Sequence, residues 1–140
     1  MHRRLFTRLV LAAVVALPFA ACGDSGTSPG RSGVVGTWDL QTINGQPLPF
    51  VIEQQGADRF ELTRDSFTFS TSRFTHTTDY RFTEAGQVEI GSEEDAGRYT
   101  LDGNALTVQF DSDGSSATAA VSGNTITFTA DGIVGVYRRQ

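Results

Sequence analysis

Few side chains in this sequence have the types and spacing that catalysis or metal binding requires. His76 is the only histidine apart from His2, and Cys22 is the only cysteine. Neither a centre of several histidines nor a thiol–imidazole pair is therefore expected. No Gly-x-Ser-x-Gly motif is present to support a serine nucleophile. We expect a protein that is not an enzyme and that carries no metal and no cofactor.

Two groups of carboxylates stand out, Glu93-Glu94-Asp95 and the pair Asp111 and Asp113. The pair resembles the start of a calcium-binding loop but lacks the later bidentate glutamate, so a hairpin turn explains it more simply. Glycoside chemistry needs paired carboxylates across a cleft, which no spacing here indicates. His76 is expected inside the structure or at its rim, with one ring nitrogen hydrogen-bonded. A polar contact to a ligand is the alternative role for His76.

Cys22 follows a basic and then an apolar N-terminus. Three arginines precede the run Leu9 to Leu17, which is far shorter than the roughly 20 residues of a membrane-spanning helix. This pattern predicts an export signal. With Ala20 and Ala21 before the cysteine, residues 1–21 resemble a bacterial lipoprotein signal peptide. The resemblance implies that Cys22 carries acyl chains such as palmitate, which anchor the protein to a membrane.

The same resemblance implies a place in the cell envelope. Family members with aspartate directly after the cysteine are retained at the inner membrane, and Gly23 occupies that position here. The periplasmic face of the outer membrane is expected in a cell with two membranes. Residues 22–33 are rich in glycine and serine and predict a flexible linker, which leaves residues 34–140 as one domain.

The chain has no lysine, and after removal of residues 1–21 it would hold eight arginines against sixteen carboxylates. This acidic balance disfavours nucleic acid and anionic lipid headgroups as partners. It does not identify a protein partner.

Beyond the linker, apolar residues recur every second position, which predicts an all-β domain. Phe74, Thr78, Tyr80 and Phe82 share one face of a long strand, and His76 lies in line with them. Turn signals separate the strands: Glu84-Ala85-Gly86-Gln87, Asp102-Gly103-Asn104, 111–115, Ser122-Gly123-Asn124 and Asp131-Gly132. Such turns join neighbouring antiparallel strands, so we predict an up-and-down meander of about eight to ten strands that closes into a barrel. Pro47 and Pro49 interrupt the pattern, and we expect a loop or short helix over 44–58.

At Val35-Gly36-Thr37-Trp38 the chain resembles lipocalins and small bacterial lipocalin-like domains, whose first strand opens with a Gly-x-Trp motif. The resemblance implies a closed β-barrel in which a basic residue of the last strand packs on Trp38. We expect Arg138 in that role, with Arg139 the second candidate. A second resemblance, through residues 38–45, is to META-type domains of envelope lipoproteins. Their Gly-Cys-Asn signature is absent here.

A barrel of about eight strands encloses its own side chains or one small ligand. The aromatic side chains of the strand faces could line such a cavity or fill it. We expect non-catalytic binding of a small apolar or amphipathic molecule. The alternative is a structural or protein-interaction module of the envelope with a filled core, which an exposed apolar patch or a common face of Arg59, Arg64, Arg73, Arg81 and Arg98 would favour. The residues expected to line a ligand site are Phe60, Phe74, His76, Tyr80, Phe82, Phe110, Phe128 and Tyr137.

Overall fold

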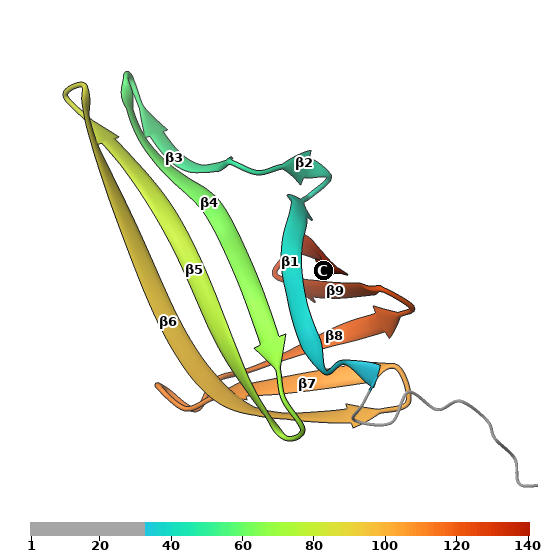
Figure 1. The fold of residues 1–140 in the computed structure, drawn as a ribbon. Helices are drawn as coiled ribbons and strands as arrows, with labels where there is room; N and C mark the ends of the chain where they lie inside the picture. The colour runs from blue at the N-terminus through green and yellow to red at the C-terminus, as the bar shows by residue number, and fades with distance from the viewer. Residues whose placement is uncertain (1–32) are drawn as a thin grey trace, which may run out of the picture.

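The computed structural model describes residues 33–140, which form an all-β domain (Figure 1). Its ten strands are β1 (Gly36–Ile43), β2 (Gln46–Pro47), β3 (Phe50–Gln55), β4 (Asp58–Phe69), β5 (Arg73–Glu84), β6 (Gln87–Asp102), β7 (Ala105–Phe110), β8 (Ser116–Ser122), β9 (Thr125–Ala130) and β10 (Ile133–Arg139). Over residues 33–140 the structure contains no helix with the length and apolar character needed to cross a bilayer. The expected signal peptide, Cys22 and nearly all of the linker lie outside the described residues.

The strands follow one another as antiparallel neighbours from β3 to β10, and β1 closes the sheet into a barrel. One half of β1 pairs with the end of β4, where Trp38 lies opposite Phe67. The other side of β1 pairs with β10, where Leu40 lies opposite Tyr137. The predicted meander and its closure by the first and last strands are confirmed. Eight strands, β1 and β4 to β10, form the barrel, and β2 and β3 extend its edges.

The prediction for residues 44–58 was wrong, because this stretch is neither a loop nor a helix. β2 pairs with β1 through Thr42 and Pro47, and β3 pairs with β4 over its whole length. Both are edge strands in the sheet order, where a proline without an N–H group does not break a ladder of hydrogen bonds. Pro47 is therefore tolerated in β2, and Pro49 lies between the two strands.

The predicted turns all lie between strands, as the sequence indicated. Asp131 and Gly132 join β9 to β10 with φ angles of 51° and 78°, and Ala85 and Gly86 join β5 to β6 with 49° and 79°. Two successive positive φ angles are typical of the tight turns that match the twist of a hairpin. Alanine is uncommon in that conformation, and the Ala85 N–H is held by the Asp58 carboxylate at 2.9 Å. The tips of two neighbouring hairpins are thereby joined.

The barrel is longer on one side than on the other. β5 pairs with β6 along its whole length, whereas β7 pairs with β6 only over Gly97–Asp102. β3, β4, β5 and the first half of β6 therefore continue beyond the closed barrel as a curved sheet, which rises to the upper left in Figure 1. We call this extension, residues 50–65 and 76–96, the arm. One face of the arm continues the interior of the barrel, and we call it the inner face.

Aromatic side chains fill the closed part of the barrel. The ring of Phe67 lies at its centre, between 4.3 and 6.5 Å from six other aromatic rings, centroid to centroid. Phe74 is only 2% exposed in this cluster. Small residues leave room for these rings, since Ala119 of β8 lies opposite Phe128 of β9. The closed barrel is thus a packed core, and space for a ligand must be sought beyond it.

Arg139, the second candidate, packs on Trp38, and Arg138, the residue expected in that role, does not. The Arg139 guanidinium lies 4.5 Å from the centroid of the Trp38 ring and donates to the backbone carbonyls of Val35, at 2.7 Å, and Gly33. Trp38 itself donates to the Val34 carbonyl at 2.8 Å. Neighbouring side chains of a strand point to opposite faces, so only one of the two arginines can cover the indole. Arg138 is exposed.

Candidate functional site

Phenylalanines and glutamates form one row across the inner face of the arm. Phe60 of β4 lies opposite Glu53 of β3 and Phe82 of β5, and Phe82 lies opposite Glu89 of β6. The rings of Phe60 and Phe82 stack with centroids 4.5 Å apart and planes at 9°. Phe82 is nevertheless 43% exposed. An aromatic pair of this kind offers an open apolar surface between two carboxylates.

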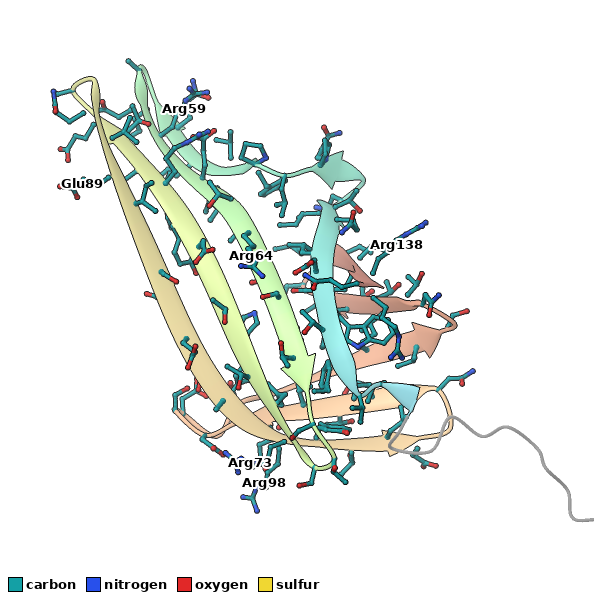
Figure 2. All side chains as sticks on the ribbon, in the orientation of Figure 1. Arg59, Arg64, Arg73, Glu89, Arg98 and Arg138 are labelled. Atoms are coloured by element: carbon teal, nitrogen blue, oxygen red, sulfur yellow. The ribbon has the colours of Figure 1, made fainter. Side chains whose placement is uncertain are left out.

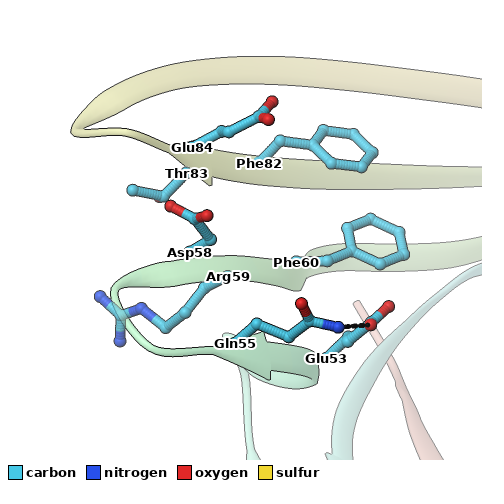
Figure 3. Close-up of a pocket in the computed structure, with 8 residues that line it drawn as sticks. All are labelled: Glu53, Gln55, Asp58, Arg59, Phe60, Phe82, Thr83 and Glu84. Atoms are coloured by element: carbon cyan, nitrogen blue, oxygen red, sulfur yellow. Dashed lines mark hydrogen bonds between the residues drawn. The ribbon is translucent and has the colours of Figure 1, made fainter.

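A hollow of about 250 Å³ lies against this row, near the end of the arm (Figure 3). Phe60 and Phe82 lie side by side there, and Glu53 and Glu84 also line the hollow. Arg59 lies at its edge, and Figure 3 shows its side chain pointing away from the two rings. Its guanidinium lies 4.0 Å from Glu61, a residue of the outer face.

A second hollow, of about 470 Å³, lies on the inner face nearer the barrel. It is lined by His76, Tyr80, Glu93 and Asp95, among others. Tyr80 connects this hollow to the aromatic row, because its ring lies 5.1 Å from that of Phe60. Burial, with the negative charge of Glu93 as a second cause, raises the pKa of Tyr80. Its hydroxyl therefore stays protonated at neutral pH and can donate a hydrogen bond.

Asp65 is the polar centre between the arm and the barrel core. It is 7% exposed, and its carboxylate accepts hydrogen bonds from the hydroxyls of Tyr137 at 2.6 Å and Thr78 at 2.9 Å. The Nε2 atom of His76 lies 2.9 Å from both carboxylate oxygens. Burial raises the pKa of Tyr137, and the Asp65 charge adds to this, so the phenol remains a donor. These bonds offset the cost of placing a carboxylate away from water.

The Asp65 cluster is not arranged for nucleophilic catalysis. The His76 nitrogen that faces the Thr78 hydroxyl at 3.5 Å is the one that contacts Asp65 at 2.9 Å. Thr78 donates its own proton to Asp65, so His76 is not placed to accept it. Within residues 33–140 no three histidine, cysteine, aspartate or glutamate side chains converge in a way that could hold a metal ion. What this cluster supplies is a fixed polar boundary to the hollows.

A third hollow, of about 320 Å³, opens on the other side of Asp65. Leu40, Phe128, Gly135 and Tyr137 contribute to its lining. Gly135 lies opposite Phe128, and a side chain there would meet Leu40 and Tyr137 at ordinary contact distances. Asp65 thus contributes to this hollow, while its hydrogen-bond partners His76 and Thr78 line the second one.

The structure brings most of the expected lining residues to these hollows. Phe60 and Phe82 line the first, His76 and Tyr80 the second, and Phe128 and Tyr137 the third. Phe74 and Phe110 do not line them, because they pack on each other in the barrel core with ring centroids 5.2 Å apart. Their place on the inner face was correctly predicted, but they lie in the part of the barrel that is filled.

Asp65, Glu53 and Glu89 are the inner residues that the sequence did not single out. The apolar alternation offers a signal for Asp65, since it changes from even positions at Phe60 and Leu62 to odd positions at Phe67 and Phe69. Such a change requires one extra residue in the strand, and the register of β4 shifts between Leu62 and Arg64. That bulge turns Asp65 inward. Glu53 carries no such signal, because its neighbours in β3 alternate poorly.

Comparison with protein-family models agrees with this fold. A family model described as a lipocalin-like domain matches residues 34–134. The chain is also similar to a crystal structure of an uncharacterized protein from Bacteroides eggerthii, with 12% identity over 76% of this chain and 98% of that one, and a TM-score of 0.44. No curated protein matches the sequence. Neither finding points to META-type domains. The chain belongs to the family of lipocalin-like domains.

Proposed function

We propose that this protein binds a small apolar or amphipathic molecule on the inner face of the arm and catalyses no reaction. One observation carries the proposal: the stacked pair Phe60 and Phe82 lies open in a hollow beyond a core that is already packed. A large aromatic ring left exposed costs hydrophobic free energy, which a bound apolar group would recover. Polar groups around it, such as the hydroxyl of Tyr80, would fix a ligand's orientation.

Native mass spectrometry of the protein purified from bacterial cells tests this proposal. The sample is the chain from residue 22 onward with Cys22→Ser, so that no acyl chain of its own can occupy the site. We expect adducts of small amphipathic molecules that decrease in Phe82→Ser. The matched control is Ile90→Ser, because Ile90 is 82% exposed but lies on the outer face of the neighbouring strand. Equal loss of adducts in both variants, or none in the parent protein, would contradict the proposal.

We further propose that the protein works at the bacterial cell envelope, held to a membrane by acyl chains on Cys22. The support is the N-terminal sequence, in which a basic and apolar segment ends in two alanines and the cysteine. Feeding labelled palmitate to cells that express the protein should label it, and Cys22→Ala should remain unlabelled and leave the membrane fraction. In a cell with two membranes the labelled protein should fractionate with the outer membrane. Palmitate in the Cys22→Ala protein would refute this anchor.

A second candidate function is contact with another protein through the outer face. Val88 and Ile90 favour it, because they are 59% and 82% exposed side by side on β6. The arginines do not, although they share that face. Figure 2 shows Arg59 near the end of the arm, Arg64 midway along β4, and Arg73 with Arg98 at the opposite end. Acidic side chains already neutralise most of these charges, for example Asp39 beside Arg64 at 3.7 Å.

A photo-crosslinking residue tests this alternative in living cells. Placed at Ile90, it should form a defined crosslinked protein product if the outer face is an interface, whereas the same residue at Phe82 should not. A product at Phe82 alone, or at neither position, would dismiss the outer face as an interface.

A further inference from the structure

We infer that the inner face of the arm is selective for amphipathic cations, such as an alkyl ammonium. This inference rests on the proposed function and specifies the chemistry of the ligand's polar end. It comes from the distribution of charge between the two faces of one sheet, together with the aromatic row already described.

The arginines of β3 to β6 all lie on one face of the sheet, whereas carboxylates lie on both faces. Residues directly opposite one another in a sheet share a face, so the register places each side chain. Glu53, Asp65, Glu89, Glu93 and Asp95 fall on the inner face with Phe60 and Phe82. Every arginine of these strands falls on the outer face: Arg59, Arg64, Arg73, Arg81 and Arg98. Within the described chain, the inner face of these strands therefore has no permanent positive charge.

The buried carboxylate of the outer face, Glu61, is paired with arginines, whereas the inner carboxylates have no arginine beside them. Glu61 on the outer face has Arg81 at 2.8 Å and Arg59 at 4.0 Å. On the inner face, Glu53 accepts only an uncharged amide hydrogen bond from Gln55, at 3.3 Å. Glu89 and Glu93 form no salt bridge or hydrogen bond with any of residues 33–140. Their charges are free to act on a ligand.

The position of these charges matches a cation that has an apolar body. Glu53 and Glu89 stand at the two ends of the row whose middle is the stacked pair Phe60 and Phe82. Glu93 lies two rows further along, about 13 Å away at 3.3–3.4 Å per residue along the strand. Aromatic faces attract a cation, and carboxylates close to a low-dielectric surface do so more strongly than in water. An anionic amphiphile would meet repulsion at the same place.

Protection of the sheet edge does not explain this distribution. The first half of β6 is an edge strand, and charged side chains on an edge prevent it from pairing with other chains. That purpose would be served by either sign of charge on either face. In β6 the inner positions hold Glu89, Glu93 and Asp95, while the outer ones include Val88 and Ile90, which are exposed and apolar. The inner face has a charge preference that edge protection does not demand.

Titration calorimetry with three probes that share one octyl chain tests the inference: octyltrimethylammonium, octyl glucoside and octyl sulfate, each below its micelle concentration. The protein is the chain from residue 22 with Cys22→Ser. We expect the ammonium probe to bind about tenfold more tightly than the glucoside, and the sulfate more weakly than either. Raising NaCl from about 50 to about 500 mM should weaken the binding of the ammonium probe only, because salt screens the attraction between its charge and the carboxylates.

Two double variants distinguish an effect of the inner-face carboxylates from an effect of the protein's net charge. Glu89→Gln with Glu93→Gln should weaken the affinity for the ammonium probe about tenfold and leave the affinity for the glucoside unchanged. Asp79→Asn with Asp102→Asn removes the same two charges, and Asp79 lies on the outer face of β5, opposite Ser92, and lines none of the three hollows. This control should keep both affinities.

The outcomes distinguish the inference from the function on which it rests. Glucoside or sulfate binding as tight as the ammonium probe overturns the cation selectivity but supports the proposed function. Equal weakening of the ammonium probe in both double variants also overturns the selectivity, since net charge alone would then explain it. If none of the probes binds, both proposals fail.

Discussion

The Tyr137 hydroxyl donates a 2.6 Å hydrogen bond to the Asp65 carboxylate and so joins β10 to β4 across the barrel interior, over a separation of 72 residues. Both residues are buried. The bond connects β10, the last strand, to β4, whose residues 58–65 belong to the arm. It therefore links the closure of the barrel to the polar boundary of the ligand hollows.

Tyr137→Phe should destabilise the protein by about 1–3 kcal/mol, because a buried carboxylate then loses one of its donors. The ring is kept, so hydrophobic burial hardly changes. Urea unfolding followed by fluorescence measures the loss. Thr107→Val, in which a half-buried hydroxyl on β7 is replaced without a change of shape, is a suitable control and should change stability little. A Tyr137→Phe protein as stable as the parent would show that the carboxylate does not need this donor.

Arg139→Ala should cost about 1–2 kcal/mol, whereas Arg138→Ala should stay within about 0.5 kcal/mol of the parent. Arg139 covers the Trp38 ring and holds the carbonyl of Val35, while Arg138 is exposed. The two variants remove the same charge from adjacent positions, so each is the other's control. Thermal unfolding and the emission of Trp38, the only tryptophan, report the difference. A larger loss of stability in Arg138→Ala than in Arg139→Ala would instead identify Arg138 as the residue that packs on Trp38.

Gly97→Ala should destabilise the fold by about 3 kcal/mol, at the upper end of the usual overpacking cost. A Cβ atom at Gly97 would lie 2.0 Å from the backbone oxygen of Gln109 and 2.7 Å from the Phe74 ring. Gly91 is the matched control, because it lies on the same face of β6 and its Cβ would meet only Phe82, at 3.6 Å. We expect Gly91→Ala to be neutral or to stabilise by up to about 1 kcal/mol, measured by urea unfolding. Similar effects at both positions would argue against the close approach of β6 and β7.

Glu61 should contribute to a loss of stability in acid. Its hydrogen bond from Arg81 is the main cause that lowers its pKa below the ordinary value of 4.5, and the charges of Arg81 and Arg59 add to this effect. The unfolded chain binds the proton more tightly, so the contribution is present above about pH 4.5 and disappears as pH falls through the lower folded pKa. Unfolding free energies of Glu61→Gln against pH should fall less steeply in this range than those of the parent. If the unfolding free energies of the two proteins fell equally steeply with decreasing pH, this prediction would be contradicted.

Much of the fold could be predicted from local patterns. Alternation in β5 gave the inner positions of Phe74, Tyr80 and Phe82 correctly, because a side-chain period of two is a property of any extended strand. The turns at Ala85-Gly86 and Asp131-Gly132 were also predictable, since few residues other than glycine tolerate positive φ. Where alternation fails, the prediction failed too: β3 follows Pro49 and contains a shift of register, and it was taken for a loop or helix.

The candidate site was predictable only in part. Phe60, Tyr80 and Phe82 were expected to line a ligand site, and they do line hollows in the arm. Phe74 has the same residue type and the same face, yet it is packed in the core. The difference arises because β7 pairs with β6 only from Gly97 onward, so the barrel is closed around Phe74 and open around Phe82.

The sequence by itself determined that this is a meander of antiparallel strands, since alternation and turn chemistry act within a few residues. Only the tertiary structure decided which part of the interior is filled. That depends on where each strand stops pairing with its neighbour and on the bulge in β4 that turns Asp65 toward Tyr137. These are relations between residues far apart in the chain, and a local pattern cannot encode the lengths and registers that establish them.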